Sequence, residues 1–179
     1  SVALTGAQDG RVYAFSSLTG ALLWASPVLG DAVQAGPSIV STDFGGSANL
    51  ALVATRTPGG DSRVYGLNLS DGTVAWTFDN GGGANGMGII SGQLSAEPST
   101  SRLWGTSRAK PGGSSDTVWC LSFTGSSATK VWSRALGDAD AATTLRNGRL
   151  YVGTNAGTVH ALDPATGSDG HYDRSVDGA

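Results

Sequence analysis

The chain has 179 residues, and only 14% of them are charged, with a formal net charge of −3. The two lysines and nine arginines are scattered without a basic run, so a surface for nucleic acid or anionic lipid is not expected. No apolar run approaches the roughly 18 residues of a membrane span. The single cysteine, Cys120, excludes an intrachain disulfide. The high glycine content, 28 residues, favours many short strands joined by tight turns.

The first residues, Ser1–Gly6, lack the basic and apolar regions of a signal peptide and resemble a strand already in progress. We therefore expect an excised or matured segment.

One sequence segment recurs along the chain. Residues 11–24 and residues 63–76 have similar residue types at corresponding positions. Further copies run over residues 117–132 and 158–167. Each copy contains a glycine at the same place, and these glycines are 52, 53 and 42 residues apart: Gly20, Gly72, Gly125 and Gly167. A period of this size predicts a repeat architecture.

The fourth copy shows most clearly how a repeat is built. Residues 149–154 are predicted as a strand, residues 155–157 as a turn, and residues 158–163 as the returning strand. The repeats also predict an outermost strand at residues 21–25. Innermost strands are predicted over residues 36–40 and 141–145.

These units predict an all-β fold, a β-propeller of four-stranded antiparallel blades. About four blades are present, over residues 1–34, 35–82, 83–137 and 138–179, as part of a larger ring of seven or eight blades. The first blade lacks its innermost strand. Residues 2–5, which contain no lysine or proline, should then pair with a strand from outside the segment or lie at a break in the ring.

The repeat resembles the quinoprotein-like (PQQ-type) β-propeller family, whose tryptophan-docking motif reads A-x-D/N-x-x-T-G-x-x-x-W. The fourth copy has His171 in the place of the tryptophan. The matching residues are Ala14, Thr19, Gly20 and Trp24 in the first copy, Asn68, Gly72 and Trp76 in the second, Thr124, Gly125 and Trp132 in the third, and Ala161, Asp163, Thr166 and Gly167 in the fourth.

The resemblance implies that Trp24, Trp76 and Trp132 are packing residues on the neighbouring blade, with the ring N–H bonded at a turn. The repeated glycines permit the close approach of that blade. Propellers of this family are most often exported, which implies a periplasmic or extracellular location. The family contains both enzymes and non-catalytic scaffolds.

The loops that enter the inner strands surround the axis of a propeller and form its usual binding face. Five polar residues in these loops are candidate ligands for a cation or a polar molecule: Asp31, Gln34, Asn85, Asp138 and Asp140. The alternative is that Asp31 and Asp138 cap turns. Residues 57–61 and 111–115 are predicted as long hairpin loops that either carry contacts or are exposed insertions.

Other residues have a structural interpretation. Cys120 lies between apolar neighbours in a strand and is expected to be a buried small hydrophobe. His160 is expected on the wetter face of its strand. Asn68-Leu69-Ser70 matches the glycosylation sequon, but Asn68 also holds the docking-motif position.

A PQQ-dependent dehydrogenase of this family would hold calcium with Glu, Asn and Asp, and would place a tryptophan under the quinone, often beside two adjacent cysteines. Trp104 is the candidate for that floor, but it lies in a second strand, away from the axis, and a vicinal disulfide is excluded. We therefore predict a non-catalytic propeller scaffold without a cofactor, which binds a protein or the remaining blades of its ring. The alternatives are a segment of a PQQ- and calcium-dependent dehydrogenase, and a ligand-sensing propeller domain.

Overall fold

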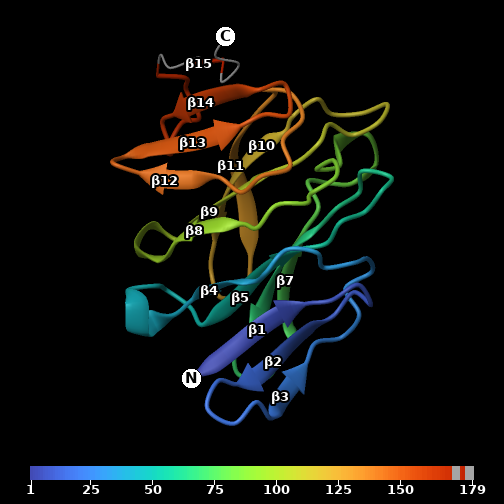
Figure 1. Cartoon of the computed structure of the whole chain (residues 1–179), viewed down its shortest axis with the longest axis vertical. Coiled ribbons are helices and arrows are strands. Elements are labelled where there is room, and N and C mark those ends of the chain that lie inside the picture. The colour runs from blue at the N-terminus through green and yellow to red at the C-terminus, as the bar shows by residue number, and fades with distance from the viewer. Residues whose placement is uncertain (171–173, 176–179) are drawn as a thin grey trace.

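The protein folds as a succession of antiparallel sheets, arranged in chain order from one end of the molecule to the other (Figure 1). The computed structural model describes residues 1–170 and the backbone strand β15 (Arg174–Ser175). Four sheets lie within this part of the chain, and we call them blades 1 to 4. The fold is a β-propeller arc, as predicted.

Blade 1 has three strands and blades 2 to 4 have four each among the described residues. Blade 1 contains β1 (Val2–Gly6), β2 (Val12–Ser16) and β3 (Leu22–Ala25). Blade 2 contains β4 (Ser38–Val40), β5 (Leu50–Ala54), β6 (Val64–Asn68) and β7 (Val74–Phe78). Blade 3 contains β8 (Ser95–Glu97), β9 (Arg102–Thr106), β10 (Val118–Phe123) and β11 (Ala128–Arg134), and blade 4 contains β12 (Thr144–Arg146), β13 (Arg149–Gly153), β14 (Thr158–Leu162) and β15.

Helical structure in the described residues is limited to three short 3-10 turns, Thr42–Phe44, Gly83–Asn85 and Pro98–Thr100. None of the described helices is long and apolar enough to cross a membrane.

Two inner strands differ from the predicted ranges. The strand expected over residues 36–40 begins at Ser38, which forms the first pair of the ladder, with Leu52 of β5. The strand expected over residues 141–145 is displaced to Thr144–Arg146. The carbonyl of Ala141 accepts a hydrogen bond from the Thr106 hydroxyl, so side-chain bonding replaces strand pairing there.

The hydrophobic core lies between blades. One cluster joins blades 1 and 2 and includes Val12, Ala51 and Leu67. A second joins blades 2 and 3, and a third joins blades 3 and 4, where Trp104 packs with Leu150. Each blade therefore depends on its neighbour for the burial of its apolar side chains.

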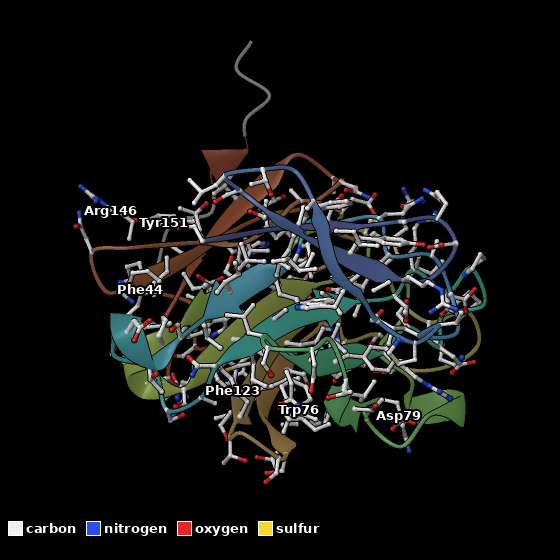
Figure 2. All side chains as sticks on the ribbon, turned by 90° about the horizontal axis from the view of Figure 1, so that it is seen from below. Phe44, Trp76, Asp79, Phe123, Arg146 and Tyr151 are labelled. Carbon is white, nitrogen blue, oxygen red and sulfur yellow. The ribbon has the colours of Figure 1, made fainter. Side chains whose placement is uncertain are left out.

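The three tryptophans of the repeat each reach the next blade. Trp24 Nε1 donates to the carbonyl of Leu69, Trp76 Nε1 to that of Thr124, and Trp132 Nε1 to that of Pro164, each at 3.1 Å. Each acceptor lies at the turn between the third and fourth strands of the next blade, so the same donor and acceptor positions recur at every junction. In Figure 2 the Trp76 and Phe123 side chains lie close together, and their ring centroids are 6.5 Å apart.

The glycines of these turns are not equivalent. A Cβ on Gly72 would clash with the Trp24 ring, and a Cβ on Gly167 would lie 2.6 Å from the Trp132 ring. Gly125, however, lies in the altered turn of the third copy, and its nearest neighbour would be the Ala48 side chain at 3.8 Å. The close approach to Trp76 is made by Gly66 of the same blade, where a Cβ would clash with the ring.

Candidate functional site

The candidate site lies on one face of the arc, which we call the loop face. In each blade, the loop between the second and third strands and the linker to the next blade lie on this face. In Figure 2, Asp79 of this face and Phe44 of the opposite face are labelled on opposite sides of the molecule. The loop face comprises hairpin residues 7–11, 55–63, 107–117 and 154–157 and linker residues 26–37, 79–94 and 135–143.

The predicted ligand residues of the linkers do not surround a common point. The Asp31 carboxylate accepts a hydrogen bond from the Thr57 hydroxyl at 2.8 Å. Gln34 is exposed, and exposed Asn85 contributes its backbone carbonyl to a 2.6 Å bond from the Asn80 side chain. In the part of the chain that the structure describes, no group of three or more His, Cys, Asp or Glu residues is placed to hold a metal ion.

Asp138 and Asp140 bind neighbouring loops. Asp138 accepts a hydrogen bond from the backbone N–H of Ala109 at 2.8 Å. Asp140 receives two N–H groups of the Arg108 guanidinium, at 2.9 and 2.6 Å, and the Asn155 side-chain amide at 3.0 Å. These two carboxylates thus join the hairpin loops of blades 3 and 4 to the linker between them.

The electrostatics of this group follow from its geometry. The hydrogen bonds from Arg108 stabilise the charged form of Asp140 and lower the pKa of its carboxyl to about 2. The same contact raises the pKa of Arg108 above its usual value. At neutral pH the pair is fully ionised, so Asp140 is already neutralised by Arg108.

Three glycine-rich loops of blades 2 and 3 pack together elsewhere on this face. We call residues 57–61, 81–88 and 109–114 the glycine-loop cluster. The Lys110 ammonium donates to the carbonyl of Gly59 at 3.2 Å and to the Asp61 carboxylate at 2.8 Å. Ser114 N donates to the carbonyl of Ala84 at 2.9 Å. The Lys110 side chain is only 10% exposed, so this cation is an internal tie between loops.

Glycine is required inside this cluster because backbones meet there. A Cβ on Gly113 would lie 2.6 Å from the carbonyl oxygen of Ala84, and one on Gly86 would lie 2.7 Å from the Asp61 carboxylate. The outer residues of the cluster, such as Pro58 and Pro111, remain exposed. The long hairpin loops noted in the sequence are therefore parts of one packed surface.

Hollows lie among these loops and along the inner strands. Two adjoining ones of about 270 and 250 Å³ share Asp61 and Arg63 as lining residues. A wider open groove of about 650 Å³ follows the inner strands β4, β8 and β12 and includes Ser38, Ser95 and Leu145 in its lining. Apart from Gln93, the side chains that line this groove are small or apolar, and none of them is ionisable.

The remaining candidates are structural. Cys120 is fully buried, and desolvation raises the pKa of its thiol to about 11. Trp104 is buried between blades 3 and 4 and donates to the carbonyl of Pro164 at 3.2 Å, a second docking contact that the sequence motif did not reveal. His160 is half-buried in β14, next to the buried Ala161, and its side chain is 12% exposed and lies 3.1 Å from Asp169. His171 lies outside the described residues.

Comparison with known proteins gives a family and a fold. The family model described as "Outer membrane protein assembly factor BamB" matches residues 1–108. The structure of BamB from Moraxella catarrhalis superposes with a TM-score of 0.67 and 20% identity, over 97% of this chain and 46% of that one. The computationally designed Ika8 protein gives a TM-score of 0.68 with 16% identity over the same shares, and the designed Ika4 protein gives 0.63 with 15% identity over 90% of this chain and 84% of that one.

The chain therefore spans about half the length of BamB and Ika8. A search of curated protein sequences found no significant match.

Proposed function

The chain belongs to the PQQ-like repeat family of β-propellers, and we propose that it is a non-catalytic scaffold that binds a protein partner through its loop face. The proposal places the protein in an exported setting, in the periplasm or outside the cell. The name of the matching family model describes an assembly factor of outer membrane proteins, which supports an envelope location and a protein as the partner.

The observation that supports this proposal most strongly is that polar side chains of the loop face form hydrogen bonds and ion pairs with neighbouring loops. Asp31, Asp138 and Asp140 all bind neighbouring loops, and Lys110 ties two hairpins together. Groups used in this way hold loops in place and leave a preformed surface of exposed backbone and small side chains. Preformed surfaces of this kind bind other proteins with little rearrangement.

Photo-crosslinking from one blade tests the proposal. Ser115 lies exposed in the loop-face hairpin of blade 3, whereas Ser99 lies exposed in the opposite-face turn of the same blade. A photoreactive residue in place of Ser115, in the natural protein within its own cells, should produce a discrete crosslinked protein species that Ser99 does not produce. Equal crosslinking from both sites, or none from Ser115, would contradict the proposal.

A further inference from the structure

Asparagine is followed directly by glycine at three places in the chain: Asn80-Gly81, Asn85-Gly86 and Asn147-Gly148. In such a pair the backbone nitrogen of glycine can attack the side-chain amide of asparagine, because glycine has no Cβ to block the approach. Two conditions determine whether this attack takes place in a folded protein. The glycine N–H must be free to lose its proton, and the peptide bond between the two residues must be free to turn toward the side chain.

Both conditions fail at Asn85-Gly86. The carbonyl of Asn85 accepts a hydrogen bond from Asn80 Nδ2 at 2.6 Å, and Gly86 N donates to the carbonyl of Gly83 at 3.1 Å. Gly86 is also buried, and a Cβ on it would lie 2.7 Å from the Asp61 carboxylate. The peptide bond between Asn85 and Gly86 is therefore held at both ends inside the glycine-loop cluster.

Asn80-Gly81 is held in a similar way. Gly81 N donates to the Asp79 carboxylate at 2.9 Å, and the Asn80 side-chain amide is the donor to Asn85. An N–H that is bonded to a carboxylate loses its proton less readily, because the resulting anion would lie beside a like charge. The Asn80 side chain is also directed at another backbone group and not at the Gly81 nitrogen.

Asn147-Gly148 differs from both of these pairs. The two residues form the exposed turn between β12 and β13, and Arg146 and Arg149 are the last pair of the ladder before it. Asn147 has a φ of +50° and Gly148 a φ of +69°, as in a two-residue hairpin turn. Within the part of the chain that the structure describes, neither the Asn147 side chain nor Gly148 N forms a hydrogen bond with another residue.

The charges next to this turn also favour the attack. Arg146 and Arg149 lie directly opposite each other in the ladder, an unfavourable arrangement for two cations. Deprotonation of Gly148 N, and a carboxylate at position 147, both add negative charge beside these two cations. The reaction therefore offsets a repulsion between like charges, whereas at Gly81 it would add to the charge of Asp79.

We propose that Asn147 is a site of spontaneous deamidation, and that the fold protects Asn80 and Asn85 from the same reaction. The Gly148 nitrogen gives its proton to hydroxide and attacks Asn147 Cγ, so that a C–N bond forms. The side-chain nitrogen leaves as ammonia, with a proton taken from water. Water then opens the resulting succinimide ring at one of its two carbonyls, which yields aspartate or isoaspartate. Water is the only reagent consumed.

The modification changes the face of the arc opposite the loop face. Figure 2 shows Arg146, the neighbour of Asn147, on the same side of the molecule as Phe44 and on the other side from Asp79. The turn gains a negative charge, and the isoaspartate product also lengthens its backbone, which disturbs the short ladder between β12 and β13. Because the loop face lies elsewhere, this modification and the proposed protein binding can be tested independently.

Peptide mapping by mass spectrometry, after incubation at about pH 8.5 and 37 °C, tests the proposal. In the native protein, Asn147 should react about ten-fold faster than Asn80 or Asn85, or more, since reaction at those two sites requires their loops to open first. In urea the three rates should become similar, because each site is then an Asn-Gly pair in an unfolded chain. Similar rates at the three sites of the native protein, or an unreactive Asn147, would overturn the proposal.

Asn80→Asp is the matched variant for the protected sites. Aspartate tolerates the φ of +55° at residue 80 but has no N–H for the Asn85 carbonyl. Deamidation of Asn85 should become about five-fold faster, the effect of losing one net hydrogen bond, and that of Asn147 should stay unchanged. An unchanged rate at Asn85, with native tryptophan fluorescence, would contradict the protection by this bond. If the variant unfolds, the comparison of the three sites in the native protein decides the outcome.

Discussion

At the scale of single residues, the hydrogen-bond partners of Asp140 determine whether its carboxylate can bind a ligand or instead holds loops together. Asp140 lies in a loop that surrounds the axis of the propeller, the position from which a cation ligand would be expected. In the structure, the Arg108 guanidinium and the Asn155 amide donate hydrogen bonds to the Asp140 carboxylate, where a cation would otherwise bind. The sequence placed Asp140 on the correct face but did not reveal these partners, because they come from two other hairpins whose distance in the fold is not encoded in the repeat.

The first prediction concerns the pH dependence of stability. The folded-state pKa of Asp140 is about 2, below its unfolded value, so the pair stabilises the fold above pH 4 and this contribution is lost as the pH falls toward 2. Asp140→Asn should remove about 1–2 kcal/mol of stability at pH 7, allowing for solvent screening, and less at pH 2. Urea denaturation of both proteins from pH 7 to pH 2 measures this. Asp43→Asn, at an exposed turn, is the control, and an equal loss in the two variants would contradict the assignment.

The second prediction concerns thiol chemistry. Cys120 is fully buried, and its thiol pKa is raised to about 11, so little thiolate is present at neutral pH. Its reaction with a disulfide reagent at pH 8 should be at least ten-fold slower in the native protein than in urea. A native rate close to the unfolded rate would show that the junction between blades 3 and 4 is open.

At the scale of elements, the repeating unit is a junction between two blades. The docking motif predicted which tryptophans lie at these junctions, because it spans the third strand of a blade, the turn after it and the fourth strand that carries the tryptophan. It did not predict the different contacts of Gly125, since the longer turn of the third copy changes the spacing on which the motif depends. Trp104 was missed as well, because it lies in a second strand outside the motif.

Two glycines separate the effect of docking from that of backbone conformation. Gly20 and Gly72 hold the same turn position with φ of +71° and +74°, but only Gly72 is covered by a tryptophan ring. Gly20→Ala should lose about 1 kcal/mol of unfolding free energy, from the positive φ alone. Gly72→Ala should lose about 2–4 kcal/mol, because the methyl group also displaces the Trp24 ring. Thermal and urea unfolding give both values, and equal losses would mean that the indole does not pack on this turn.

The inner strands of blades 2, 3 and 4 share a feature that is visible in the sequence, a hydroxyl residue at the same place in each repeat. Ser38, Ser95 and Thr144 occupy the same place in their repeats, and an alignment of inner strands by that place would have found them. What such an alignment does not give is the acceptor. The carbonyls that the Ser38 and Ser95 hydroxyls reach belong to the next blade, and only the assembled arc brings donor and acceptor together.

At the scale of the whole molecule, the fold was predictable and the candidate site was predictable only in location. The spacing of the repeats and their turn residues predict where each blade begins and ends. The blades must then pack against one another, because each buries its apolar faces on a neighbour. The glycine-loop cluster depends on contacts between loops of different length, which have no periodic signal. Its Lys110 was therefore overlooked, although it is the residue that joins two hairpins.

The central claim is that the polar residues of the loop face hold loops together and do not bind a quinone and its cation. Isothermal titration calorimetry of the protein with PQQ in the presence of calcium tests it most directly. We predict no binding heat at micromolar concentrations, because Asp138 and Asp140 are already engaged by Ala109 and Arg108. Micromolar or tighter binding of PQQ that is lost in the Asp138→Asn/Asp140→Asn double variant would contradict the scaffold account.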